Sequence, residues 1–324
     1  MRCFDRLDNV ADLDAAVSNE QRAVDLTDGK HPMLLANLGC TLHRRFERFG
    51  EPEDLERSIS NCMAAVKQMD EGDPDRPLHL SNLGTSQISW YERYRKTSDL
   101  KIAICNQEQA VNLTHDGHPT KPSQLCNLGR SLHSRFERIG KPVDIEYSIF
   151  HFTAAIKLVD DGHPEKPDYF NNLGGSLLSR FAQHGNLDDL NNAITNRQTA
   201  VDLAGDRHQK RSMYLVNLGH NYVIRFKRFG QLINIEDGIR NQQWAVELMR
   251  DGHIDKPMYL SYLGVSQRRR FRRFGELSDI ESAILNQKEA IRLTSDGHLG
   301  MPMHLVNLGI CQDNRFGVSA NWLI

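Results

Sequence analysis

Apolar residues recur along the chain at helical spacing, in stretches separated by short polar segments. One stretch lies between residues 121 and 139, where apolar side chains three or four positions apart share one helix face. These side chains are Leu125, Leu128, Leu132, Phe136 and Ile139. A second stripe follows after a short loop and comprises Ile145, Ile149, Ala155, Ile156 and Val159. The pattern therefore predicts two consecutive helices, each with one apolar face.

The same pair of helices is predicted repeatedly along the sequence, with a period of 45 residues. A glycine in the phrase Asn-Leu-Gly, or Tyr-Leu-Gly once, marks the copies at Gly39, Gly84, Gly129, Gly174, Gly219, Gly264 and Gly309. So strict a period indicates a solenoid, in which each unit buries its apolar face against its neighbours. We therefore expect an all-α fold, with seven antiparallel helix pairs in one array over residues 1–324.

The copies also predict where the units begin and end. We expect an incomplete first unit over residues 1–32, then full units, and a truncated last helix over residues 303–324. The full units are 33–77, 78–122, 123–167, 168–212, 213–257 and 258–302. Because neither end shows the polar cap that terminal repeats normally carry, we expect either a fragment of a longer array or head-to-tail self-association through the uncapped ends.

Small residues predict the helix boundaries within a unit. Gly140 and its copies follow the first helix and suit its C-terminal cap. Asp144 and its copies, with Asn234 once in their place, suit the N-cap of the second helix. The glycine of Asn-Leu-Gly lies inside the first helix, where it costs about 1 kcal/mol relative to alanine. We therefore expect it to let the paired helix approach closely.

The repeated motif NLGxxLxxRFxRxG…DLxxAIxxxxxAVxL…DGHPxKP resembles that of tetratricopeptide (TPR) repeats. The unit is longer than the usual one of about 34 residues. It looks like the repeats of kinesin light chains, and still more like fungal arrays often fused to NB-ARC, phosphorylase-like or CHAT domains, none of which is visible here. The resemblance implies a right-handed superhelix whose first helices line a concave groove, and a protein or peptide bound in that groove.

Helical arithmetic places a polar stripe beside the apolar face of each first helix. At about 100° per residue, Asn127, Ser131, Arg135 and Arg138 fall within about 80° of one another. The asparagine row comprises Asn37, Asn82, Asn127, Asn172, Asn217 and Asn307, with Tyr262 as the exception. The first arginine row comprises Arg45, Arg135, Arg180, Arg225, Arg270 and Arg315, with Trp90 as the exception. A second arginine row comprises Arg48, Arg93, Arg138, Arg228 and Arg273.

Two interpretations of these rows stay open. Asparagine amides can pair with the backbone of an extended peptide, and arginine forks would favour its acidic side chains. Alternatively, asparagine ties one first helix to the next, and arginine pairs with acids such as Glu137 or Asp144 or covers apolar surface. Recurrence in every unit favours packing, because a ligand needs only some units. The exceptions Trp90 and Tyr262 are then the better candidates for specific contacts.

A histidine also recurs in the Asp-Gly-His-Pro loop, at His118, His163, His208, His253 and His298. Copies one repeat apart lie too far from each other to share a metal ion, and no HExxH motif occurs. We expect this histidine to bond the last carbonyls of the preceding helix instead. Nucleotide-binding, hydrolase and kinase signatures are absent from the sequence. We therefore expect no enzymatic activity, no cofactor and no metal site.

The amino-acid composition limits the classes of partner and the cellular location that we expect. The net charge of −2 argues against a general binder of nucleic acid or anionic membranes, although a local stripe can still be basic. The six cysteines have no metal spacing and suit a reducing compartment. The sequence shows no signal-peptide stretch and no apolar run that would span a membrane, so we expect the cytoplasm, or the nucleus, as the location.

Two functions are consistent with these features. The sequence favours a non-catalytic scaffold for protein–protein interaction, which binds an extended, acidic peptide in the concave groove. The alternative is a structural or regulatory array that positions or self-associates an effector domain absent from this chain. In both cases the expected partner is a protein or peptide.

Overall fold

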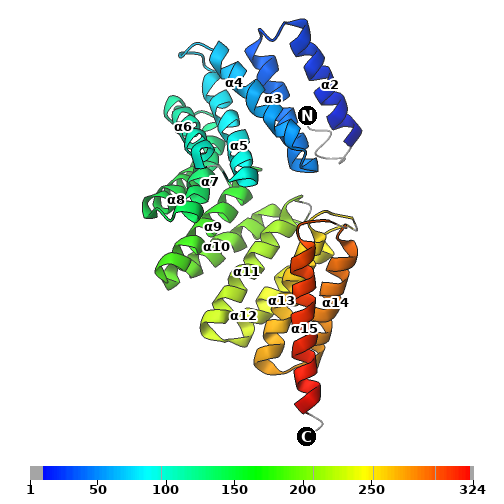
Figure 1. Ribbon diagram of the computed structural model, residues 1–324. Coiled ribbons are helices and arrows are strands. Elements are labelled where there is room, and N and C mark those ends of the chain that lie inside the picture. Colours follow the sequence, from blue (N-terminus) through cyan, green and yellow to red (C-terminus); the bar gives the residue numbers. More distant parts are fainter. Residues whose placement is uncertain (1–9, 96, 207, 251, 296, 322–324) are drawn as a thin grey trace. The chain divides into compact units, whose positions relative to one another are not determined.

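The computed structural model describes residues 10–95, 97–206, 208–250, 252–295 and 297–321. All regular structure in these ranges is α-helical, which confirms the predicted fold class (Figure 1). The chain divides into two compact blocks, an N-terminal block (Met1–Asp160) and a C-terminal block (Asp161–Ile324). No helix of the described residues is long and apolar enough to cross a membrane.

Helices follow one another along the chain with only short connections. The N-terminal block contains α2 (Val10–Leu26), α3 (Pro32–Phe49), α4 (Pro52–Gln68), α5 (Arg76–Tyr94), α6 (Thr97–Leu113), α7 (Lys121–Ile139) and α8 (Pro142–Lys157). The C-terminal block contains α9 (Lys166–His184), α10 (Leu187–Ala204), α11 (Arg211–Phe229), α12 (Leu232–Glu247), α13 (Lys256–Phe274), α14 (Leu277–Leu293) and α15 (Met301–Asn321).

Each full unit is a pair of helices that pack side by side. We call α3, α5, α7, α9, α11, α13 and α15 the first helices, and α2, α4, α6, α8, α10, α12 and α14 the second helices. Within a block, each second helix also packs against the first helix of the next unit. The core therefore lies between the packed helices, and its contacts recur from one unit to the next. The leucine of the phrase Asn-Leu-Gly lies in this layer, and Leu128, for example, is buried.

The glycine inside each first helix lies against the second helix of its own unit, as expected. A methyl group added at Gly219 would stand 2.8 Å from the carbonyl oxygen of Gly238, and one added at Gly264 would stand 3.0 Å from that of Ala283. The side chain opposite the glycine is a glutamine in three units and varies in the others: Cys62, Gln107, Phe152, Arg197, Gln242 and Gln287. Gly309 in α15 is different, because none of the described atoms lies within 4 Å of such a methyl group.

Among the side chains that lie opposite these glycines, that of Arg197 carries a charge. Its side chain is buried, and burial lowers the pKa of its guanidinium to about 10. Nη1 donates a hydrogen bond of 2.8 Å to the carbonyl oxygen of Asn217 and another to Oδ1 of Asn221. Amide oxygens of the next first helix, α11, therefore solvate this charge.

Helix boundaries agree only partly with the sequence. Gly140 adopts φ 73° and its N–H donates to the carbonyl oxygen of Phe136 at 2.7 Å, so the predicted cap of the first helix is confirmed. The predicted N-cap of the second helix is wrong, because α8 begins at Pro142 and Asp144 lies within its first turn. Proline suits that turn because its missing N–H would have no partner there. The carboxylate of Asp144 is consequently available to another side chain.

The loop between units also differs from expectation. The prediction that its histidine bonds the preceding helix is wrong, because Nδ1 accepts the backbone N–H two residues further on, at 3.0–3.3 Å in all copies. The preceding carbonyls are bonded by the cation at the start of the next helix. Lys121 Nζ donates to the carbonyl oxygens of Val111 at 2.7 Å and Thr114 at 2.6 Å. Arg76, Arg211 and Lys256 bond equivalent carbonyls.

Replacing Gly219 with alanine is expected to destabilise the fold, because the new methyl group would press on a backbone oxygen of α12. Overpacking of this kind costs about 1–3 kcal/mol, which exceeds the ~1 kcal/mol gained when glycine leaves a helix interior. Gly309→Ala is the matched control at the same repeat position with open space, and it should raise stability. Urea unfolding midpoints of the two variants would show this, and shifts of the same sign would contradict it.

Candidate functional site

Three of the six residues of the asparagine row join neighbouring first helices within a block. Asn127 Nδ2 donates to Ser81 Oγ at 3.2 Å, and Asn307 Nδ2 donates to Ser261 Oγ at 3.1 Å. The amide of Asn217 likewise donates to Asn171 Oδ1 at 3.0 Å. These three amides therefore bond one first helix to the next.

The remaining asparagines differ from this arrangement. Asn172 Oδ1 accepts a long hydrogen bond of 3.5 Å from Asn171. Asn37 is exposed and Asn82 is half-buried, and neither side chain makes a hydrogen bond within the part of the chain that the structure describes. These two amides, on α3 and α5, therefore have donors and acceptors available for a ligand.

The first arginine row pairs with the residue that was expected to be the N-cap. Arg135 Nε and Nη2 each donate to the carboxylate of Asp144 at 2.7 Å, and this hydrogen bonding raises the pKa of Arg135. The pair joins the first helix α7 to the second helix α8, and its carboxylate is fully buried while the Arg135 side chain is 24% exposed. The same fork occurs in other units as Arg45 with Asp54, Arg180 with Asp189, and Arg270 with Asp279. In a further unit, Arg225 Nε donates to Asn234 Oδ1 at 2.7 Å.

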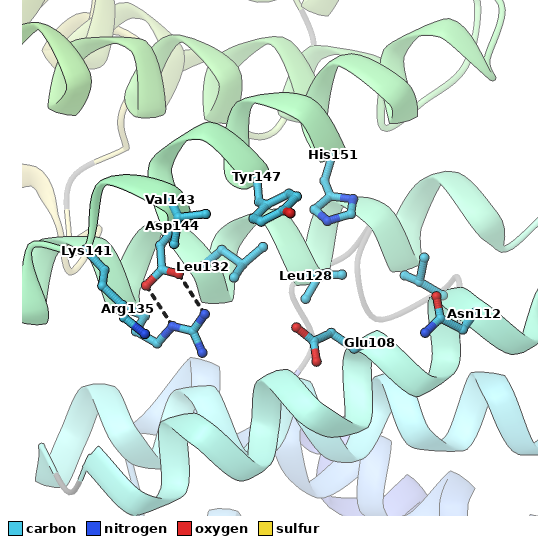
Figure 2. A pocket seen from close by; sticks show the side chains of 11 residues that line it. Glu108, Asn112, Leu128, Leu132, Arg135, Lys141, Val143, Asp144, Tyr147 and His151 are labelled. Carbon is cyan, nitrogen blue, oxygen red and sulfur yellow. Dashed lines mark hydrogen bonds and ion pairs between the residues drawn. The ribbon is translucent and has the colours of Figure 1, made fainter.

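These arginines lie between consecutive second helices. Arg135 lines a cavity of about 330 Å³ whose walls come from α6 and α8 and whose floor is formed by α7 (Figure 2). Glu108 projects from α6, while Tyr147 and His151 project from α8. Burial and, secondarily, the charge of Lys121 lower the pKa of His151 to about 4, so that it is neutral at physiological pH. Arg45 lines an equivalent cavity of about 400 Å³ between α2 and α4.

Trp90 and Tyr262, the exceptions to the two rows, differ in their surroundings. Trp90 replaces arginine in α5 and contacts Tyr94, with ring centroids 4.2 Å apart. Tyr262 replaces asparagine in α13 and is 40% exposed. An exposed tyrosine offers both an apolar ring and a hydroxyl to a partner.

Sequence reasoning missed a group of cations on α11 and α13. Lys227, Arg268, Arg269, Arg272 and Arg273, which we call the basic cluster, line a cavity of about 550 Å³ together with Phe226 and Gly230. The available signal was the run Arg-Arg-Arg-Phe-Arg-Arg over residues 268–273, which is found in a single copy of the repeat. These side chains make no ion pair within the described ranges of the chain. This cavity is therefore a candidate site for an anionic ligand.

No protein-family model matches the sequence, and no curated protein matches it. Solved structures are similar at low identity. BtubC (BKLC) from P. vanneervenii has 16% identity and a TM-score of 0.52, over 74% of this chain and 90% of that one. Yeast Tom70 has 14% identity and a TM-score of 0.53, over 95% and 59% of the two chains. A human IFIT1 dimer with PPP-AAAA has 14% identity and a TM-score of 0.51, over 96% and 70%.

The fold is TPR-like. The similarity agrees with the paired helices and with the glycine contacts inside each pair. At such low identities it describes the arrangement of the backbone and assigns no ligand.

Removing the fork at one unit should be costly. Arg135→Ala is expected to destabilise the fold by about 3–5 kcal/mol, because it leaves the buried carboxylate of Asp144 without its partner. Arg138→Ala, on the exposed side of the same helix, should change stability by less than about 0.5 kcal/mol. Denaturant titrations of the two variants test this prediction. Similar values for both would show that the fork contributes little to stability.

Proposed function

We propose that the chain is a non-catalytic scaffold that binds an extended, acidic segment of a partner protein on the surface of its first helices. The observation that carries this proposal is the basic cluster, whose cations have no acidic partner among the described residues. A TPR-like array presents many similar helix faces in succession, which suits an extended ligand. In this proposal the acidic side chains of the ligand supply the missing countercharges.

The proposal assigns different tasks to the predicted site residues. Asn37 and Asn82 contact the backbone of a bound segment, because their amides are not used in packing. Trp90 and Tyr262 add apolar contacts on α5 and α13. The first arginine row instead joins the two helices of a unit, because its guanidinium groups already bind buried side chains.

A second function is favoured by a separate observation. α15 exposes apolar side chains at positions that other first helices bury or partly bury, including Leu305 at 52% and Val306 at 60%. Exposed apolar faces of this kind mark interaction surfaces. A structural array that self-associates head to tail would cover them, and its apparent mass in light scattering would rise with protein concentration.

Binding of fluorescent peptide pools tests the scaffold function. We expect an acidic pool to bind saturably, with an affinity that falls as salt is raised, because salt screens exposed charges. A basic pool of the same length is the control and should not bind. If neither pool binds while the mass depends on concentration, the structural array replaces the scaffold.

Paired asparagine variants separate recognition from packing. Asn37→Ala/Asn82→Ala should weaken peptide binding and leave stability nearly unchanged, because these amides make no internal hydrogen bond among the described residues. Asn127→Ala/Asn217→Ala should lower stability by about 1 kcal/mol per lost hydrogen bond and leave the affinity unchanged. Anisotropy titrations and urea unfolding measure the two effects. The reverse outcome would place recognition on the packing asparagines.

A further inference from the structure

The basic cluster departs from the repeat, and this separates it from the packing rows. Ten residues after the asparagine position, the N-terminal block has Glu47, Glu92 and Glu137, whereas α11 and α13 have Lys227 and Arg272. The units therefore fold with either charge at this position. Packing does not require the cations of α11 and α13, so a ligand is the simpler reason for them.

One more position shows the same departure. Six residues after the asparagine position, most units carry an apolar or imidazole side chain: His43, Ile88, His133, Leu178 and Val223. α13 carries Arg268 there, with Nε buried and without a hydrogen-bond partner among the described residues. A buried donor without a partner costs free energy. An anion in the cavity that Arg268 lines would provide the missing acceptor.

The cations of the cluster also repel one another. Burial and the neighbouring charge of Arg272 both lower the pKa of Arg269. By contrast, Arg270 lies between these residues in the sequence and is neutralised by Asp279. Among the described residues, no carboxylate lines the cavity. A ligand that brings more than one negative charge would relieve this repulsion best.

The chemistry of guanidinium groups selects among anions. A carboxylate carries one charge on two oxygens, whereas a phosphate monoester carries nearly two charges on three acceptor oxygens. Arginine forks bind phosphate with parallel hydrogen bonds, and several arginines can share one phosphate. The cavity also has an apolar edge, because the ring of Phe226 lines it and the exposed ring of Phe274 lies 6.2 Å from that of Phe226.

We propose that the basic cluster binds a phosphorylated side chain of the partner protein. This inference rests on the proposed scaffold function and names the chemical group that the cavity accepts. The phosphate lies among Arg268, Arg269 and Arg272, and the apolar edge contacts a neighbouring residue of the same segment. A nucleic acid fits less well, because its backbone needs cations along a path. Here the adjacent first helix α9 has neutral residues at the corresponding positions: Leu178, Ser179, Ala182 and Gln183.

Three short labelled peptides with identical acidic flanks test the phosphate. They carry phosphoserine, glutamate or serine at the centre, and fluorescence anisotropy measures their affinities for the whole chain. We expect the phosphoserine peptide to bind about tenfold more tightly than the glutamate peptide, because charge-assisted bonds to two or more arginines are gained. Inorganic phosphate at high concentration should compete with it.

Variants that carry the residues of other units at these positions test whether the phosphate binds at the basic cluster. Arg272→Glu introduces the residue of α3, α5 and α7 at this position, and Arg268→Val introduces that of α11, so both should fold. Each is expected to weaken binding of the phosphoserine peptide about tenfold or more. Arg138→Glu in α7 is the matched control outside the cluster and should bind as the unchanged protein does. Circular dichroism checks that helicity is equal in all variants.

The possible outcomes separate this inference from the scaffold function. Equal affinities for the phosphoserine and glutamate peptides would overturn the phosphate site and leave the scaffold standing. No binding of any acidic peptide would overturn both. Tighter binding of a single-stranded RNA oligonucleotide than of the phosphoserine peptide would show that the cluster serves nucleic acid instead. Unchanged binding by Arg272→Glu would move the site away from the cluster.

Discussion

The whole array depends on the close contact between the two helices of each unit. At the glycine of the phrase Asn-Leu-Gly, the first helix has no side chain, so atoms of the second helix reach its backbone. Near the C-terminal end of the first helix, an arginine donates hydrogen bonds to a buried carboxylate in the first turn of the second helix. One contact sets the separation of the helices and the other fixes how they are aligned. These two contacts therefore position the side chains that the helices expose on the surface.

The sequence predicted the backbone well, because its apolar period and its glycines are local signals repeated many times. It predicted α7 with both of its ends, and it anticipated the close approach at the glycine. It misplaced Asp144, since an aspartate near a helix start suits either a cap or the first turn, and only the pairing with Arg135 decides between them. The loop histidine was assigned the wrong partner for a similar reason, because two neighbouring helix ends both offer bonds to it.

Candidate site residues were harder to predict than the fold, because a repeated polar residue has two possible uses. The structure shows that Asn127 and Arg135 are engaged in packing, whereas Asn37 keeps a free amide. The basic cluster was visible in the sequence as a run of arginines, yet its meaning depends on which members are paired. Arg270 is neutralised and its neighbours are not, and this difference requires coordinates. The proposed anion site is therefore built from residues that differ from the other copies of the repeat.

The side chains opposite the glycines have a further consequence for assembly of the chain during folding. Units that share one motif could exchange partners, so that a first helix joins the second helix of the wrong unit. Glutamine lies opposite the glycine in three units, but Phe152 and Arg197 differ from it in volume and charge, so the units that carry them offer a different match at this point. Arg197, for example, finds the amide oxygen of Asn221 only beside its proper neighbour, since Ser131 and Ser176 occupy that position in other units. The contact of Arg197 with Asn221 thus favours the correct pairing of these two neighbouring units over pairing with the others.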